Sequence, residues 1–102
     1  MVQKIEWTEQ SKNDLSKIKE YIAGDSLFQS ERIIKLIYFS VQKLTSYPEI
    51  GKVIYRSEKY LVRRILIKNY RVIYVFHSDT IFILSVQHQS KELGTDFDLT
   101  FI

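Results

Sequence analysis

The sequence has no cysteine at all, and its 102 residues include only two histidines, three glycines and one proline. Without cysteine the chain can form neither a disulfide framework nor a thiolate nucleophile, and two histidines leave little material for a metal site. We therefore expect no structural metal and no cofactor. No apolar run approaches the roughly 18 residues needed to cross a bilayer, and the beginning, MVQKIEWTEQ, lacks the apolar stretch of a signal peptide. These absences predict a cytoplasmic protein that does not contact a membrane.

What the chain does contain is enough apolar material for one core. Hydrophobic residues make up 45% of the sequence. A chain of this length can bury one core but not two. No internal repeat or low-complexity linker divides it. We expect a single domain over residues 1–102.

Positive charge is concentrated in residues 52–71. This stretch holds Lys52, Arg56, Lys59, Arg63, Arg64, Lys68 and Arg71 against Glu58 alone, whereas residues 1–51 are balanced and residues 72–102 are net negative. Such a patch favours an anionic partner, either nucleic acid or an acidic protein segment. The alternative is that these residues are solvated charges on strand edges, which resist aggregation.

The beginning of the chain is predicted to hold a strand and an amphipathic helix. Residues 3–7 alternate apolar and charged side chains, which is typical of a short strand. Thr8 is suited to cap a helix, and apolar residues then recur at helical spacing until residues 23–25.

A second, longer helix is predicted to begin after Ser26. Gln29 lies three positions later, as in a capping box. The helix is expected to run to about Ser46, because Pro48 pushes the residue before it out of the helical region. Its apolar surface is wide enough to pack on both a sheet and the first helix. Residues 47–51 should then form a turn.

Residues 60–91 contain three β-rich runs separated by two short polar breaks, Lys68-Asn69 and Ser78-Asp79. We interpret them as an antiparallel meander with two-residue turns. Opposed residues point the same way, so this register puts Arg64 and Arg71 on one face and brings His88 beside them. A three-residue turn at either hairpin would invert this parity.

Each face of the predicted meander has its own composition. One is almost continuously apolar and suits packing against the two helices: Ile65, Ile67, Val72, Tyr74, Phe76, Ile81 and Ile83. The arginine face is also rich in apolar residues: Val62, Leu66, Ile73, Val75, Phe82, Leu84 and Val86. That surface is too apolar to be left to water, so either a partner or the chain's own tail should cover it. We favour a partner.

The predicted cluster of Arg64, Arg71 and His88 has two interpretations. Two guanidiniums can bind a phosphate and stabilise a pentavalent transition state, while an imidazole can transfer a proton at neutral pH. This would be the equipment of a metal-free ribonuclease. Alternatively, the arginine stems lie over apolar neighbours and His88 binds the backbone at a strand end, which spacing alone slightly favours. His77 lies beside a turn and is a weaker candidate.

Several short motifs follow one another along the chain in a specific order. They are a first strand ending in Trp7, Asp14-Leu15-x-x-Ile18-x-x-Tyr21-Ile22, Leu44 followed by Tyr47-Pro48-x-x-Gly51, Val62-Arg63-Arg64-Ile65, Tyr70-Arg71-Val72-Ile73-Tyr74, and Ile83-Leu84-x-Val86-x-His88. Over residues 3–93 the chain resembles the ParE/RelE superfamily of bacterial type II toxins, known from plasmid-stabilisation modules. The resemblance implies an α+β fold in the order β-α-α-β-β-β, with two N-terminal helices packed on one face of a small twisted antiparallel sheet. It also implies an acidic antitoxin as partner in a hetero-oligomer, and growth arrest when the toxin is free.

The resemblance leaves the target open. In the RelE-like ribosome-dependent mRNA nucleases, the positions matching Arg64 and Arg71 contribute to catalysis. Those enzymes typically add an arginine after the last strand, where this chain has Gln89 and Ser90. A nuclease would have to rely on His88.

The ending from His88 to Glu92 and Leu93 is more similar to the ParE branch, whose members poison DNA gyrase by binding it. We therefore expect a gyrase-binding toxin, with a ribosome-dependent mRNA endonuclease and a degenerate, non-toxic antitoxin-binding module as alternatives. The expected surface for target or antitoxin comprises Val62, Arg64, Leu66, Arg71, Ile73, Phe82, Leu84, His88 and Lys91.

Overall fold

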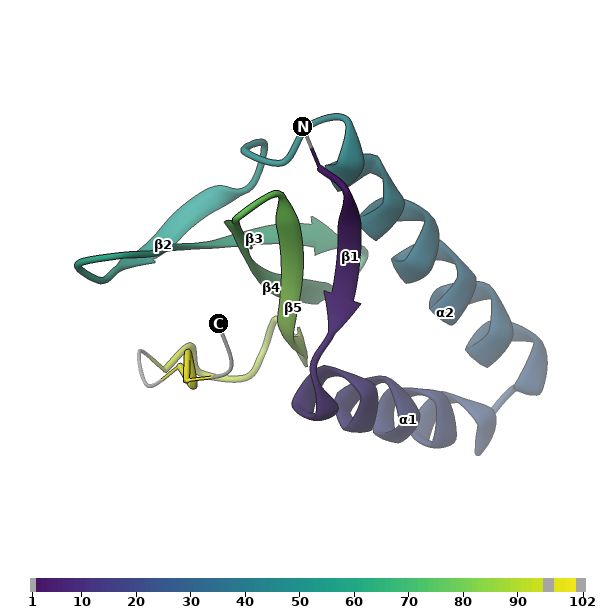
Figure 1. Ribbon diagram of the computed structural model, residues 1–102. Coiled ribbons are helices and arrows are strands. Elements are labelled where there is room, and N and C mark those ends of the chain that lie inside the picture. The colour runs from purple at the N-terminus through teal and green to yellow at the C-terminus, as the bar shows by residue number, and fades with distance from the viewer. Residues whose placement is uncertain (1, 95–96, 101–102) are drawn as a thin grey trace.

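The computed structural model describes residues 2–94 and 97–100 (Figure 1). The elements are β1 (Lys4–Trp7), α1 (Glu9–Ala23), α2 (Leu27–Gln42), a 3₁₀ turn (Lys43–Thr45), β2 (Lys52–Arg56), β3 (Leu61–Ile67), β4 (Tyr70–His77) and β5 (Thr80–His88). The strands form one sheet in the order β1-β5-β4-β3-β2. The predicted α+β class, with two helices on one side of a sheet, is confirmed.

Side-chain caps set the starts of both helices, as the sequence predicted. The Thr8 hydroxyl accepts a hydrogen bond from the Ser11 N–H at 3.2 Å, and the Ser26 hydroxyl accepts one from the Gln29 N–H at 3.2 Å. Each satisfies an amide that has no partner within the helix. The α-helical part of α2 ends at Gln42, earlier than expected, and a single 3₁₀ turn continues the chain towards Pro48.

The sheet differs from the prediction in two respects. β2 is an additional strand that pairs antiparallel with β3, and β1 pairs with β5 in parallel, so the sheet is mixed. β2 is a short outer strand with a charged residue at each end, which is how natural sheets protect an edge. Its three central residues are consecutively apolar, so it lacks the alternation that would have marked it as a strand in the sequence.

Both predicted hairpin turns are present. Ile67 pairs with Tyr70 across the first. The second, Ser78-Asp79, has positive φ angles of 50° and 62°, as a type I′ turn requires. The expected register therefore holds throughout β3 and β4.

β5 departs from the expected register in its middle. Tyr74 pairs with Ile83, but the preceding residue of β4, Ile73, pairs with Ser85, so Leu84 is an extra residue in the strand. This bulge reverses the parity of everything after it. Val86, expected on the arginine face, instead belongs to the core beneath the helices and pairs with Val72.

Helix α1 holds the bulge in place through Asp14. Its Oδ2 accepts hydrogen bonds from the Val86 N–H at 3.0 Å and the Ser85 hydroxyl at 2.8 Å. An amide that a bulge displaces from the ladder needs another acceptor, and a carboxylate provides a strong one. A residue 72 positions away thus fixes the local geometry of β5.

The helix-covered face carries the larger core. Leu15 of α1 and Ile37 and Val41 of α2 pack with Val72 and Ile83 of the sheet, and all five are buried. Figure 1 shows α2 on one side of the sheet and the C-terminal tail on the other. The two sides are therefore covered by very different kinds of structure.

Tyr74 fixes the turn before β2. Its hydroxyl donates to the Pro48 carbonyl and accepts from the Gly51 N–H, both at 2.9 Å. Arg63 adds hydrogen bonds to the carbonyls of Glu49 and Gly51, also at 2.9 Å. Burial raises the pKa of the Tyr74 phenol, so it stays protonated and able to donate. These contacts give the Pro48 and Gly51 motif a structural role.

Candidate target-binding face

Two arginines lie on the sheet face opposite the helices. Arg64 of β3 pairs with Ile73 of β4, and Arg71 of β4 pairs with Leu66 of β3. Residues 64 and 66 point the same way, as do 71 and 73, because side chains alternate along a strand. The predicted common face of Arg64 and Arg71 is therefore observed.

The two guanidiniums have different surroundings. Arg71 donates from Nε and Nη2 to the Gln87 amide oxygen at 3.4 and 3.3 Å, and from Nη2 to the Lys91 carbonyl. Arg64 is half-buried and, among the described residues, has no hydrogen-bond or ion-pair partner. Arg71 is thus held in position, whereas the Arg64 guanidinium has no partner in the described part of the chain.

His88 does not join the arginines, contrary to the sequence prediction. It pairs with Tyr70, and their rings meet edge to face with centroids 5.4 Å apart. Tyr70 packs on the core beneath the helices, so His88 lies on the other side of the sheet from Arg71. The Leu84 bulge is the cause. The His88 Nδ1 also accepts the Ser90 N–H at 3.1 Å, which is the backbone-bonded alternative for this residue.

The second histidine, His77, is also distant from Arg71. His77 points to the same side as Arg71, but six residues of extended strand separate them by about 20 Å. Its ring instead contacts Tyr60 at 4.9 Å. Neither imidazole of the chain therefore lies beside the arginine pair.

The chain's own tail covers the apolar part of this face, where we had favoured a partner. Val62, Ile73, Val75 and Leu84 form a second buried cluster. Three half-buried apolar residues of the tail pack against it: Leu93, Phe97 and Leu99. Several residues of the expected binding surface are thus inaccessible while the tail is in place.

The rest of that expected surface remains reachable. Leu66 is 52% exposed, Phe82 is half-buried, and Lys91 is exposed. Leu66 lies next to both arginines on the same face. The open part of the face is therefore a small apolar and cationic area beside the tail.

A cavity of about 660 Å³ lies between the tail and the start of α1. Its lining includes Thr8, Glu9, Lys12, Gln87, Phe97 and Asp98.

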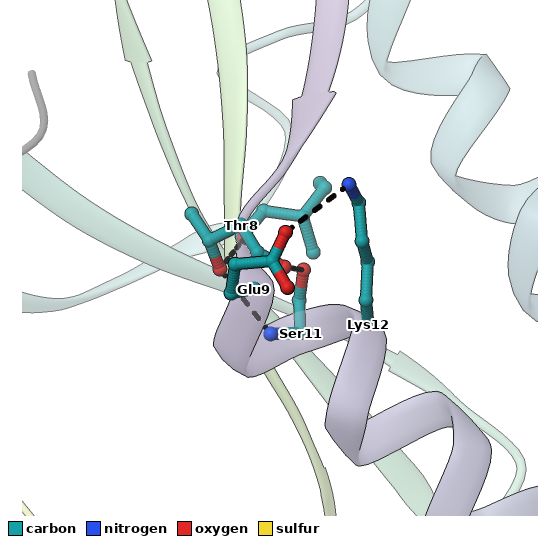
Figure 2. Close-up of polar contacts among 5 residues, drawn as sticks. Thr8, Glu9, Ser11 and Lys12 are labelled. Carbon is teal, nitrogen blue, oxygen red and sulfur yellow. Dashed lines mark hydrogen bonds and ion pairs between the residues drawn. The ribbon is translucent and has the colours of Figure 1, made fainter.

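Figure 2 shows Thr8 capping the helix through Ser11, with the Glu9 carboxylate 3.5 Å from the Lys12 ammonium. Thr100 donates to Asp98 and lowers the pKa of that exposed carboxyl. The described residues contain no group of three potential metal ligands.

Residues 5–93 match the sequence profile described as the ParE toxin of type II toxin-antitoxin systems, parDE. The chain belongs to the ParE toxin family. No curated protein sequence gives a significant match. The ParE-family chain also contains no helix, in its described part, that is long and apolar enough to cross a membrane.

Solved structures share the fold of this ParE-family chain at low sequence identity. The chromosomal ParDE system from P. aeruginosa has a TM-score of 0.70 at 15% identity, covering 85% of this chain and 96% of that one. The RelBE2 toxin-antitoxin complex from Mycobacterium tuberculosis has a TM-score of 0.56 at 22% identity, covering 86% and 99%. The YoeB-YefM complex from Staphylococcus aureus has a TM-score of 0.51 at 17% identity, covering 86% and 97%.

Two polar residues that organise this ParE-family face were missed in the sequence. Gln87 positions Arg71, and Asp14 holds the bulge that places Gln87 opposite Arg71. Asp14 belongs to one of the family-like motifs, but its position on the helix does not by itself indicate a partner on β5. The sequence signal for this contact is an acidic residue next to the apolar Leu15 on the core side of the helix. A carboxylate in such a place needs a hydrogen-bond partner.

Proposed function

We propose that this chain arrests growth when free of its antitoxin, and that it acts by binding DNA gyrase rather than by cutting mRNA. The observation that carries the proposal is the separation of His88 from Arg64 and Arg71. The arginine face can then bind an anionic or polar surface without an imidazole to transfer protons.

Metal-free cleavage of RNA needs a proton donor or acceptor within hydrogen-bond reach of the reacting phosphate. Here one histidine lies on the opposite side of the sheet, and the other lies about 20 Å along the strand from Arg71. Arg71 is itself engaged by Gln87 and the Lys91 carbonyl. This arrangement supports recognition over histidine-dependent cleavage of RNA.

The partner we propose in the resting state is an acidic antitoxin. The similar structures include toxin-antitoxin complexes, and the basic stretch of residues 52–71 would attract an acidic segment. The resulting assembly would be a hetero-oligomer of toxin and antitoxin.

The test is expression of the chain alone, followed by separate readouts of DNA supercoiling and translation. We expect purified protein to inhibit gyrase supercoiling, and Arg64→Ala to weaken that inhibition at least tenfold. Lys59→Ala is the matched control, because it removes one positive charge from an exposed position outside the sheet face. Growth arrest with unchanged supercoiling by the purified protein would contradict the proposal.

A ribosome-dependent mRNA endonuclease is the second candidate, favoured by the common face of Arg64 and Arg71. It predicts cuts in mRNA on programmed ribosomes that disappear in Arg71→Ala. Toeprinting detects such cuts directly. Intact mRNA in cells that have stopped growing would rule this candidate out.

A further inference from the structure

The tail of this chain covers a surface that is fully formed without it. Val62, Ile73 and Val75 have no exposed area, and they lie in the middle of β3 and β4, whose pairing is complete. The described residues of the tail add no strand to the sheet. It therefore acts as a cover on a finished surface.

Within residues 92–94 and 97–100, few contacts hold this cover. Phe97 meets Tyr55 with ring centroids 5.5 Å apart, and Arg71 donates to the Lys91 carbonyl. Leu93 and Leu99 contribute half-buried side chains. In the described stretches 92–94 and 97–100, no backbone hydrogen bond reaches the sheet. A segment held by a few side chains opens far more readily than the strands beneath it.

The tail and the surface also have complementary chemistry. Acidic and large apolar residues alternate in the tail around Phe97, Asp98 and Leu99, with the apolar ones turned inward and the acid exposed. The surface beneath is apolar, and Arg64, which is unpaired among the described residues, lies on the same face of the sheet. The tail thus has the composition of an acidic, apolar ligand attached to its own binding site.

We propose that the tail is a tethered ligand, and that the surface it covers binds an acidic, apolar segment of a partner protein in exchange for it. Docking of the tail and binding of the partner segment exclude each other. The tail lowers the apparent affinity for the partner, because an attached ligand acts at a high effective concentration. The inference rests on the proposed antitoxin only for the natural identity of the partner.

The experiment uses a synthetic peptide of residues 92–102 as the probe, titrated against the full chain and against a chain ending at Lys91. Because the chain has no cysteine, a Thr45→Cys variant can be labelled with a dye at one site. Thr45 is exposed and lies far from the tail in the sequence. We expect the peptide to bind the shortened chain at least tenfold more tightly than the full chain. A peptide with Phe97→Ala and Leu99→Ala should lose this binding, and one with Asp98→Asn should bind more weakly.

A full-length variant guards against misfolding of the shortened chain. Phe97→Ala with Leu99→Ala removes two anchoring side chains but keeps the length, and it should bind the unmodified peptide more tightly than the parent does. Equal binding to parent and released chains, or no binding to either folded variant, would overturn the proposal. Tighter binding of single-stranded RNA than of peptide to the shortened chain would also overturn it, because the surface would then serve nucleic acid. None of these readouts involves gyrase, so a failed supercoiling test leaves this result independent.

Discussion

The two sides of the sheet are covered in opposite ways. On one side, two helices of 15 and 16 residues pack on the sheet, and Asp14 and Tyr74 make hydrogen bonds that connect distant parts of the chain. On the other side, Leu93, Phe97 and Leu99 of the tail rest on a buried cluster. The comparison teaches that burial alone does not show which surface is permanent. Both clusters are buried, but among the described residues the hydrogen bonds of Asp14 and Tyr74 fasten the helix-covered one, whereas side-chain packing holds most of the tail.

The largest difference should appear at Gly51, within that framework. A Cβ there would lie 2.6 Å from the Tyr74 hydroxyl and 2.8 Å from the Arg64 carbonyl. Gly51→Ala should therefore lower the free energy of unfolding by roughly 2–4 kcal/mol through overpacking and a lost hydrogen bond. Urea denaturation measures this change.

Gly24 provides the matched control. Its φ is −57°, and an added Cβ would come no closer than 3.4 Å to another atom. Gly24→Ala should leave stability unchanged or raise it by up to about 1 kcal/mol. An equal loss of stability in Gly51→Ala and Gly24→Ala would mean that the hydrogen bonds around Tyr74 do not make Gly51 a special position.

Asp14 tests the link between α1 and the bulge. Asp14→Ala leaves the buried Val86 N–H without an acceptor and should cost about 2 kcal/mol. Asp14→Asn keeps one acceptor oxygen and should cost less. Hydrogen exchange at the Val86 amide reports the same bond directly, and unchanged protection in Asp14→Ala would contradict this role.

A pair of valines compares the two sides most directly. Val72 under the helices and Val62 under the tail are both fully buried. Val72→Ala should cost about 2 kcal/mol, because the fixed helices cannot fill the cavity. Val62→Ala should cost about 1 kcal/mol, because the loosely held tail can settle into the space. A larger loss at Val62, measured by thermal or urea unfolding, would show that the tail is as rigid as the helices.

The same contrast explains what the sequence could reveal. Local features were predictable: the Thr8 and Ser26 caps, and both hairpin turns with their neighbouring pairs. The Leu84 bulge was not, because its stabilising carboxylate comes from Asp14, far away in the sequence. Missing one extra residue was enough to put His88 on the wrong side.

The remaining differences have similar causes. β2 is a charged edge strand without the apolar alternation that marks a half-buried strand. The parallel pairing of β1 with β5 joins two segments that are far apart in the sequence, and no local pattern contains that information. The covering role of the tail depends on the shape of the surface under it. Family resemblance supplied the architecture, but the site depended on these long-range contacts.

Alkaline pH should weaken the helix side selectively. Burial raises the pKa of Tyr74 above its ordinary value of 10.0, so the folded chain holds this proton more tightly than the unfolded chain. The associated stability is complete below pH 10 and is lost as the pH rises through the folded-state pKa. Tyr74→Phe should be less stable at neutral pH but show a flatter decline above pH 10. Thermal unfolding as a function of pH measures both slopes, and parallel curves would contradict the assignment.

The smallest expected effect distinguishes two neighbouring arginines on opposite faces of β3. Arg63 donates to two carbonyls of the turn before β2, so Arg63→Ala should cost about 1 kcal/mol. Arg64 has no such partner among the described residues, and Arg64→Ala should change stability by less than about 0.5 kcal/mol. If Arg64→Ala abolishes target binding while stability stays constant, its charge is kept for a partner outside the fold. If Arg64→Ala instead lowers stability as much as Arg63→Ala does, Arg64 has a structural role in the sheet.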